Sequence, residues 1–524
     1  MCVIRSGQIV LRSHMKFQAI KGVRDILPPD SALWNRVEQA AREVFSTYGY
    51  GEIRLPIFES AELFARSVGI ETDIVNKEIY LAVEPSLATH EKDRNQLLME
   101  NTEDAPNKDA ARARIDFHIE LTKAGVRSGA ISQQDNELIL QEFANLQKNG
   151  QLLAGADWVA YVRRAKDLLS KLCYLPQLSL RPEATASVVR AYIEHGMHTR
   201  PGNVKLYYMG PMFRGERPQK GRYRQFYQIG VELLGASDHP AIDAEVIEML
   251  LAFFERIGLK GTALSINSIG DKQCRPKYVE TLRAALREVK DKLGADSQRR
   301  IETNPLRVLD SKAPDERPII EKLPRIAEHL CDGCRNHYAE LKRQLALRGV
   351  SYTENWRLVR GLDYYMRTTF EVTATGLGSQ DAVCGGGRYD GLVEQLGGPA
   401  GTKGIGFAIG TDRVILSLEH QAGDAKPPAA IEVYLAWMGA AAYPAAVALA
   451  QKMRRQGTAV ELPAVEMRFG KSLNLADRLG AKYAVILGDD ELASKQFTVK
   501  RLADGDQKKL SESDLLSYLL PRTQ

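Results

Sequence analysis

The stretch that decides the fold is Lys205–Gly235, KLYYMGPMFRGERPQKGRYRQFYQIGVELLG, in which two strand-like runs flank a loop from Gly215 to Arg224. The loop holds a single acidic residue, Glu216, among the cations Arg217, Lys220, Arg222 and Arg224. Cations this close repel one another, so the loop is costly unless an anion binds there. The planar donor fork of arginine matches phosphate oxygens. The hairpin therefore predicts a phosphate-binding surface; a solvated basic loop on a structural hairpin is the alternative.

The second run of this hairpin alternates with period two, which places every other side chain on one face of a strand. That face carries Phe226, Gln228, Gly230 and Glu232. An aromatic ring, an amide and a carboxylate are therefore expected to line one surface beside Arg214.

Two further segments carry polar chemistry. RLVRGLDYYMRTTFEV contains Arg360, a candidate fixed cation, and Tyr364 and Tyr365, two candidate pocket walls that could equally be half-buried packing residues. CGGGRYDGLVEQLGG contains Gly385–Gly387, and three glycines in a strand indicate the close approach of a ligand or of another backbone.

Nucleotide-binding fingerprints are missing from the sequence. In GIGFAIGTDRVI the spacing of Gly404, Gly406 and Gly410 does not match G-x-G-x-x-G, and no G-x-x-x-x-G-K-[ST] occurs. A nucleotide must therefore be held in some other way.

The composition is that of a globular protein. The 524 residues carry 71 Lys and Arg against 66 Asp and Glu, a net charge of +5, and only 6 Cys, which excludes a disordered chain and a small disulfide-stapled secreted domain. No apolar run is long enough to cross a membrane. The apolar stretch within the first fourteen residues is too interrupted for a secretory leader, and we expect a cytoplasmic location. Met1 and Met15 both remain possible start residues.

One local cluster could hold a metal: His329, Cys331, Cys334 and His337. The cluster lies in a stretch with helical character, whereas a zinc ribbon takes its ligand pairs from separate turns. We expect no zinc here, and cysteine packed as a small core residue is the favoured interpretation.

The pattern changes along the chain divide it into sections. Residues 16–81 mix helix and strand, with a helix predicted from Asp30 and a strand over GEIRLPIFE that bends or ends at Pro56. Residues 82–175 are predicted to be a helical insertion, residues 176–420 are rich in strands, and HQAGDAKPPAA is the predicted linker. From 431 to 524 strands and helices alternate, which favours an α/β module with mostly parallel strands.

Several of these segments resemble the histidyl-tRNA synthetases, which are class II aminoacyl-tRNA synthetases. KGVRDILPPD is similar to their N-terminal signature, EIRLPIFES to motif 1 with Pro56 at the dimer interface, FRGERPQKGRYRQF to motif 2 and GIGFAIGTDR to motif 3. RGLDYY and GGGRYDGL resemble the blocks specific to the histidine enzymes. The resemblance leaves out the insertion and the N-terminal extension 1–15.

The resemblance implies an α+β fold: an antiparallel sheet with flanking helices in two catalytic parts, 16–81 and 176–420, followed by an anticodon-binding domain. It implies a cytoplasmic homodimer that joins L-histidine to tRNA(His) through a histidyl-adenylate. ATP is consumed, and AMP and pyrophosphate are released. It also implies Mg²⁺ on the outer phosphates.

The resemblance also suggests roles for single residues. Arg214 and Arg360 are the expected catalytic cations at the α-phosphate and substrate carboxylate. The expected ATP-binding residues are Arg214, Glu216, Phe226 and Arg413. The expected histidine-binding residues are Glu183, Ala184, Thr185, Arg214, Gln228, Glu232, Arg360, Tyr364 and Tyr365. Gln219 and Arg222 are expected to touch the acceptor end of the tRNA.

The sequence departs from the family pattern at Ala184, where glycine is usual, and in the insertion, whose role as surface decoration or RNA contact stays open. A regulatory paralogue that binds histidine is one alternative. Such proteins lack the C-terminal module and have lost ATP residues, whereas Arg214, Arg360 and Arg413 are present here. A dimeric RNA-binding module without catalysis is the other alternative.

Overall fold

The computed structural model describes residues 18–69, 72, 74–82, 96–99, 108–127, 133–149, 156–171, 178–378, 381–423 and 431–519. The N-terminal extension, with both possible start residues, and most of the predicted linker lie outside the described residues. The chain forms two compact units, which divide between Ala422 and Gly423 except that Ile26–Leu33 are grouped with the second unit. None of the described helices has the length and apolar character that a membrane crossing needs.

The centre of the larger unit is an eight-stranded sheet with the order β1-β5-β6-β11-β10-β9-β7-β8. All neighbouring strands are antiparallel except the edge pairs β1–β5 and β7–β8, which are parallel. The strands are β1 (Gly51–Glu52), β5 (Val204–Phe213), β6 (Gln225–Gly235), β7 (Ala263–Ser268), β8 (Thr353–Glu354), β9 (Met366–Thr373), β10 (Ala382–Arg388) and β11 (Lys403–Gly410). This is the antiparallel sheet that the resemblance implies.

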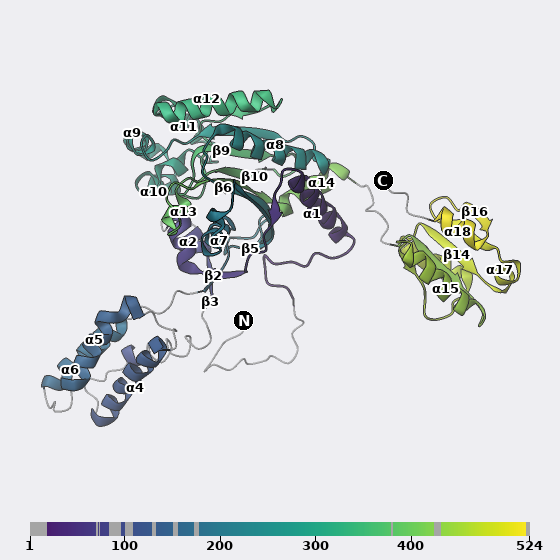
Figure 1. Ribbon diagram of the computed structural model, residues 1–524, viewed down its shortest axis with the longest axis horizontal. Helices are drawn as coiled ribbons and strands as arrows, with labels where there is room; N and C mark the ends of the chain where they lie inside the picture. Colours follow the sequence, from purple (N-terminus) through teal and green to yellow (C-terminus); the bar gives the residue numbers. More distant parts are fainter. Residues whose placement is uncertain are drawn as a thin grey trace. The chain divides into compact units, whose positions relative to one another are not determined.

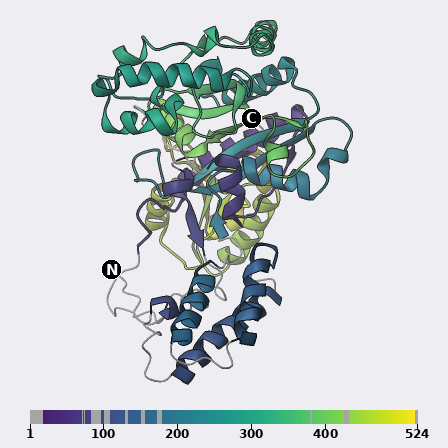
Figure 2. The ribbon, with the colours of Figure 1, turned by 90° about the vertical axis from the view of Figure 1, so that its left-hand side faces the viewer.

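Helices cover the sheet because each presents an apolar face to it. Helix α1 (Asp30–Thr47), which begins at the residue predicted from the sequence, buries Trp34, Val37 and Phe45 on one face. Helix α8 (Pro240–Arg256) packs on β11, and α12 (Asp332–Leu347) packs on α8 and β9. Figures 1 and 2 show α8 and α12 stacked over the same side of the sheet.

Several shorter helices complete the larger unit. They are α2 (Ala61–Val68), α7 (Thr185–Glu194), α9 (Arg275–Glu288), α10 (Ala295–Thr303), α11 (Arg317–Ile320), α13 (Leu392–Gln395) and α14 (Thr411–Ala422). Short 3-10 or π turns occur at Ile74–Glu78, Met197–Thr199, Lys290–Lys292, Pro305–Val308 and Ile326–Glu328.

A buried ion network ties the sheet to α8. Arg388, at the end of β10, is completely buried and donates to Asp243 on α8 at 2.9 Å and to Asp390 at 2.7 Å. Asp243 also accepts from Thr368 on β9 at 2.6 Å. A buried charge is tolerated only when it is paired in this way, so the network fixes β9 and β10 relative to the helix behind them.

The strand predicted over GEIRLPIFE is divided in two by residues 53–57, a stretch that contains Pro56. Its first residues form β1, and the chain re-enters a separate three-stranded sheet as β2 (Phe58–Ser60). That sheet has the order β2-β4-β3, with β4 (Leu178–Leu180) between β2 and β3 (Tyr80–Ala82). Proline lacks the N–H that a strand ladder needs, so Pro56 cannot donate to such a ladder within the stretch between the two strands.

The described part of the insertion is helical, as predicted. It contains α4 (Lys108–Arg127), α5 (Gln133–Asn149) and α6 (Ala156–Lys171). These helices share an apolar core of their own, which includes Ile115, Phe143, Trp158 and Leu168.

The smaller unit is a five-stranded sheet with the order β13-β12-β14-β15-β16. Its strands are β12 (Val433–Trp437), β13 (Val460–Glu461), β14 (Tyr483–Leu487), β15 (Phe497–Arg501) and β16 (Gln507–Leu510), and its helices are α15 (Ala442–Arg455), α16 (Phe469–Arg478), α17 (Asp489–Ser494) and α18 (Glu512–Tyr518). Strands β13, β12 and β14 are parallel as predicted, because α15 and α16 connect them. Strands β15 and β16 are antiparallel instead, since a short hairpin joins them.

Candidate active site

A cavity of about 380 Å³ opens on the large sheet and brings together arginines from distant parts of the chain. Arg214 follows β5, Arg360 lies in the loop before β9, and Arg413 lies in the first turn of α14. All three line the cavity. Each comes from a different segment that the sequence analysis singled out, so the fold assembles a concentration of positive charge that no single segment holds.

The guanidinium of Arg360 crosses β10 at a glycine. A Cβ atom added to Gly385 would lie 1.9 Å from Nη2 of Arg360, far inside van der Waals contact. The run Gly385–Gly387 was predicted to mark the approach of a ligand or a backbone, and the structure shows an arginine side chain at its first glycine. Arg360 Nη1 also donates to Glu371 at 3.2 Å, while its Nε is buried without a partner in the described part of the chain.

Arg214 lies between the backbone and an aromatic ring. Its Nε donates to the carbonyl oxygen of Pro182 at 3.0 Å, and its guanidinium carbon lies 5.1 Å from the ring centre of Phe226. Both residues line the cavity, so Phe226 offers a flat apolar surface beside a cation.

Glu216 and Arg222 form an ion pair, and both residues line the cavity. Arg214 lies near the same carboxylate, with Nη1 3.9 Å from Oε1. Gln219, by contrast, is exposed at the tip of the loop, where its backbone pairs with that of Arg222. The two residues predicted to touch the tRNA therefore differ: Gln219 faces solvent, and Arg222 lies with the other cavity cations.

Arg413 is fixed by two backbone carbonyls. Its Nε donates to Gly221 at 3.1 Å and its Nη1 to Ala382 at 2.8 Å. The preceding residue, Asp412, accepts from the backbone N–H of Tyr227 and from Arg24, each at 2.8 Å. These bonds hold the start of α14 against β6 and the N-terminal segment.

The N-terminus of α7 presents a carboxylate at the cavity. Glu183 accepts from the backbone N–H groups of Thr185 at 2.7 Å and Ala186 at 3.0 Å, as an anion at a helix start does. Burial raises the pKa of Glu183, although these two N–H groups oppose the rise. The side chain of Ala184, which was expected to bind histidine, is buried in the hydrophobic core and does not line the cavity, so its methyl group is accommodated away from the cavity.

Glu232 lies behind the cavity wall and is fully buried. It accepts from the hydroxyl groups of Thr185 at 2.6 Å and Tyr389 at 2.5 Å. Burial raises the pKa of Glu232 to about 8. A Cβ atom on the neighbouring Gly406 would lie 2.0 Å from Oε2 of Glu232, so glycine is required there.

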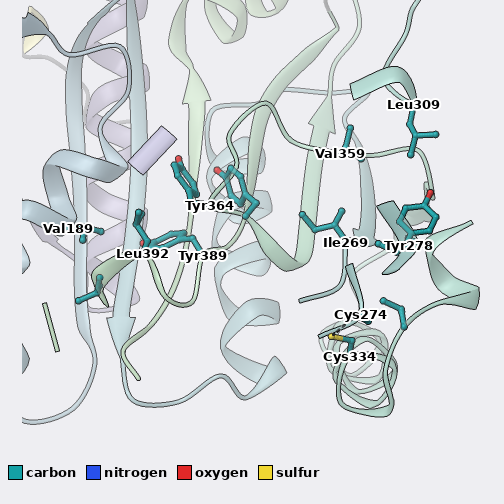
Figure 3. Close-up of a cluster of buried hydrophobic side chains, with 14 of the residues drawn as sticks. Val189, Ile269, Cys274, Tyr278, Leu309, Cys334, Val359, Tyr364, Tyr389 and Leu392 are labelled. Atoms are coloured by element: carbon teal, nitrogen blue, oxygen red, sulfur yellow. Dashed lines mark hydrogen bonds between the residues drawn. The ribbon is translucent and has the colours of Figure 1, made fainter. Parts of the chain in front are cut away.

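The cavity wall beside Glu232 is aromatic and polar. The rings of Tyr364 and Tyr365 lie 4.7 Å apart between centres, and those of Tyr364 and Tyr389 lie 5.9 Å apart; Figure 3 labels Tyr364 and Tyr389. The hydroxyl group of Tyr364 lies 3.4 Å from Glu183. Gln228 presents a buried carbonyl oxygen that has no hydrogen-bond partner among the described residues. The wall thus offers an unused acceptor in a polar pocket.

Sequence reasoning missed several residues of this site. Tyr389 stands in the quoted segment GGGRYDGL, and its position directly after a glycine-rich strand was the available signal. Tyr389 lies behind the cavity wall, where it donates to Glu232. Glu371 and Cys384 line the cavity itself, but they have the pattern of ordinary strand residues in the sequence. Their neighbours are known only once β9 and β10 are paired.

The cluster of histidines and cysteines does not come together as the sequence pattern suggests. The ring of His329 lies against Tyr278, and His337 contacts the carbonyl oxygen of Asp238 at 3.1 Å. Cys331 and Cys334 instead meet Cys274, a cysteine that looked isolated in the sequence. Cys2 and Cys173 lie outside the described residues.

Comparison with known proteins identifies the relatives of the chain. A family model described as histidyl-tRNA synthetase matches residues 163–414, and one described as an anticodon binding domain matches residues 432–522. The histidine–tRNA ligase of Koribacter versatilis is 46% identical over 96% of both chains, and that of Solibacter usitatus is 43% identical over 96% of this chain and 98% of its own. The apo histidyl-tRNA synthetase of S. aureus has a TM-score of 0.64 and 30% identity, over 96% of this chain and 100% of its own.

Proposed function

The chain belongs to the histidyl-tRNA synthetase family, and from that premise we propose how its cavity carries out the reaction. The activity is the ATP-dependent ligation of L-histidine to tRNA(His) through a histidyl-adenylate. The histidine carboxylate attacks the α-phosphorus of ATP, an oxygen–phosphorus bond forms, and pyrophosphate leaves. A hydroxyl group of the terminal ribose of the tRNA then attacks the carbonyl carbon, and AMP leaves.

The observation that carries the mechanism is the convergence of Arg214, Arg360 and Arg413 on one cavity. Carboxylate attack on a phosphate brings two negative groups together, so the transition state needs fixed positive charge and alignment. We assign Arg214 and Arg360 to the α-phosphate and the attacking carboxylate, and Arg413 to the outer phosphates. The buried, unpartnered Nε of Arg360 supports its role as a donor to substrate.

Arg222 is best assigned to the phosphates as well. Its ion pair with Glu216 inside the cavity supports this role over contact with the acceptor end of the tRNA. The exposed Gln219 remains the proposed acceptor-end residue. Phe226 is proposed to stack on adenine, with Glu216 facing the same base.

The histidine pocket is proposed to run from Glu183 to Gln228. The Glu183 carboxylate at the start of α7, with Thr185, would bind the substrate ammonium group. Imidazole presents two polar nitrogens, and the unused carbonyl oxygen of Gln228 is a suitable acceptor for an N–H group. Tyr364 and Tyr365 would wall the ring, and Glu232 would hold Thr185 in place. Apolar side chains would leave these groups unpaired and be rejected by ~10⁴-fold or more.

The cavity also fits a magnesium ion. Glu371 supplies a hard carboxylate oxygen of the kind that Mg²⁺ prefers, and it lines the cavity. When bound, the ion would neutralise charge on the outer phosphates of ATP.

Dimerisation and a cytoplasmic location also remain proposals. Apolar side chains are exposed on and beside the three-stranded sheet β2-β4-β3. The exposed fraction is 54% for Phe58, 38% for Leu178 and 42% for Ile57, which precedes β2. The register places Phe58 and Leu178 on one face. We propose that a second copy covers this face.

The double variant Phe58→Glu/Leu178→Glu should give a monomer by light scattering. The matched control Leu347→Glu, at a side chain 67% exposed on α12, should stay a dimer.

Aminoacylation of a tRNA(His) transcript tests the proposed function. The purified chain should charge the transcript with histidine and with none of the other amino acids, and only when ATP and Mg²⁺ are present. Failure to charge, together with no histidine-dependent exchange of pyrophosphate into ATP, would leave the regulatory alternative in its place.

A further inference from the structure

We propose that Asp271, Cys274, Cys331 and Cys334 form a structural zinc site that is separate from the active-site cavity. One ligand atom from each of these residues lies within 4.8 Å of all the others. The residues come from two places in the chain, the loop after β7 and the start of α12, which the fold brings together. Figure 3 labels Cys274 and Cys334 where the two segments meet.

The interatomic distances fit a tetrahedral metal. A zinc ion with Zn–S bonds of about 2.3 Å and a Zn–O bond of about 2.0 Å has S···S edges of about 3.8 Å and S···O edges of about 3.5 Å. Here the sulfur atoms of Cys274 and Cys334 lie 3.8 Å apart, and the Cys274 sulfur lies 3.5 Å from Asp271 Oδ1. The Cys331 sulfur lies 3.9 Å from both carboxylate oxygens of Asp271. Small movements of these side chains would bring the remaining ligand–ligand distances to the values of a tetrahedral zinc site.

The local backbone supports the same interpretation. Each ligand pair has two residues between its members, D-x-x-C at 271–274 and C-x-x-C at 331–334, and each stands at the start of a helix. The backbone N–H of Asp271 points at the Cys274 sulfur at 3.4 Å. Gly270 adopts a positive φ of 67°, and a Cβ there would lie 2.7 Å from that sulfur. The turn therefore leaves room for a sulfur atom directly over the backbone.

The surrounding charges and donor types favour zinc. Three thiolates and one carboxylate exceed the charge of a divalent ion by two, and Arg367 Nη2 lies 3.5 Å from Asp271 to offset part of it. Thiolates select zinc over magnesium or calcium, and zinc accepts mixed sulfur and oxygen ligands in a tetrahedron. Cys274 and Cys334 are buried, and all three cysteines are free thiols.

The site would stabilise the segment behind the histidine pocket. Arg275, the residue after Cys274, donates to the backbone oxygen of Tyr365 at 2.5 Å. The backbone N–H of Arg367 donates to Gly270 at 2.7 Å. A metal at the 271–274 turn would therefore hold the loop that carries Tyr364 and Tyr365 against the start of α12, without touching substrate.

Metal content tests the proposal, because it does not depend on catalysis. The full chain, purified with reductant and without chelator, should contain about one zinc per chain by plasma mass spectrometry. Cys274→Ser and Cys331→Ser should each reduce zinc below about 0.2 equivalents. The control His329→Ala removes a member of the sequence pattern that lies outside the proposed ligand set, and it should keep the full equivalent.

A spectroscopic probe covers the case in which a cysteine variant folds poorly. Cobalt(II) added to the reduced, metal-stripped chain should give sulfur-to-cobalt charge-transfer absorption and the visible bands of a tetrahedral ion. Zinc and cobalt should also raise the melting temperature of that chain. The proposal is wrong if reduced chain offered zinc retains none after desalting, if Cys331→Ser and wild type bind equally, or if Cys274 and Cys334 prove to be joined as a disulfide in the native protein.

Discussion

Gly385→Ala is the most informative single substitution, because it acts on Arg360 without changing that residue. The added Cβ would lie 1.9 Å from Nη2, 2.4 Å from Cζ and 2.5 Å from Nη1 of Arg360, whereas ordinary contact begins near 3.4 Å. The guanidinium must therefore retreat by 3.4 − 1.9 = 1.5 Å. Misplacing a catalytic group by about 1 Å costs on the order of 10²-fold in rate.

The expected loss is ~10²–10³-fold in kcat/KM for histidine-dependent ATP–pyrophosphate exchange, or about 2.7–4 kcal/mol. Arg360→Ala should cost a similar amount, because both variants remove the same preorganised cation. The two effects should not add, so the double variant should be no slower than Arg360→Ala alone. Gly470→Ala is the control, since a Cβ there has no atom within 4 Å and the residue lies in α16, in the other unit.

The assay measures the exchange of labelled pyrophosphate into ATP in the absence of tRNA, from samples quenched at set times. Thermal melting checks that each variant is folded. A folded Gly385→Ala chain with exchange within about 3-fold of wild type would refute the reasoning, because Arg360 would then not need its present position. Additive losses in the double variant would also contradict it, since they would give the glycine a role independent of Arg360.

Three further predictions follow from the site. Phe226→Ala should raise the KM for ATP ~5- to 100-fold and leave the KM for histidine near its wild-type value, because stacking on a base contributes about 1–3 kcal/mol; equal rises in both constants would contradict the stack. Burial raises the pKa of Glu232 to about 8, so the folded chain binds this proton more tightly than the unfolded chain does. The stability that this group contributes is therefore complete below about pH 4 and is lost as the pH rises toward 8. In denaturant titrations, the free energy of unfolding of wild type should fall between pH 5 and 8 relative to that of Glu232→Gln. Parallel plots of this free energy against pH for the two proteins would disprove the shift in pKa. Arg222→Ala should lower pyrophosphate exchange more than Gln219→Ala does, whereas Gln219→Ala should act mainly on transfer to tRNA; the reverse order would return Arg222 to the acceptor end.

The sequence predicts best those parts of the site that are local in the chain. The face that carries Phe226 and Gln228 follows from the period-two alternation of one strand. The positive charge of the loop around Arg222 follows from its composition, whatever its conformation. Nothing local in the sequence indicates that the side chain of Arg222, which is predicted to touch the tRNA, turns back onto Glu216. That pairing depends on how the hairpin folds over the sheet.

Non-local relations were beyond prediction. Gly385 stands 25 residues after Arg360, and only the pairing of β9 with β10 shows that the glycine makes room for that side chain. Cys274 and Cys334 are 60 residues apart, so the pattern around His329 does not reveal that these two cysteines meet. Charge and periodicity constrain neighbours along the chain, whereas close approach across a sheet is fixed by strand order.

The most direct test is a structure of the chain with a non-hydrolysable histidyl-adenylate analogue and pyrophosphate. The mechanism predicts guanidinium nitrogens of Arg214 and Arg360 within about 2.7–3.2 Å of the α-phosphate mimic, a guanidinium nitrogen of Arg413 equally close to pyrophosphate, and an imidazole nitrogen bonded to Gln228. Phosphate groups bound away from these three side chains, with the guanidiniums facing solvent, would contradict it.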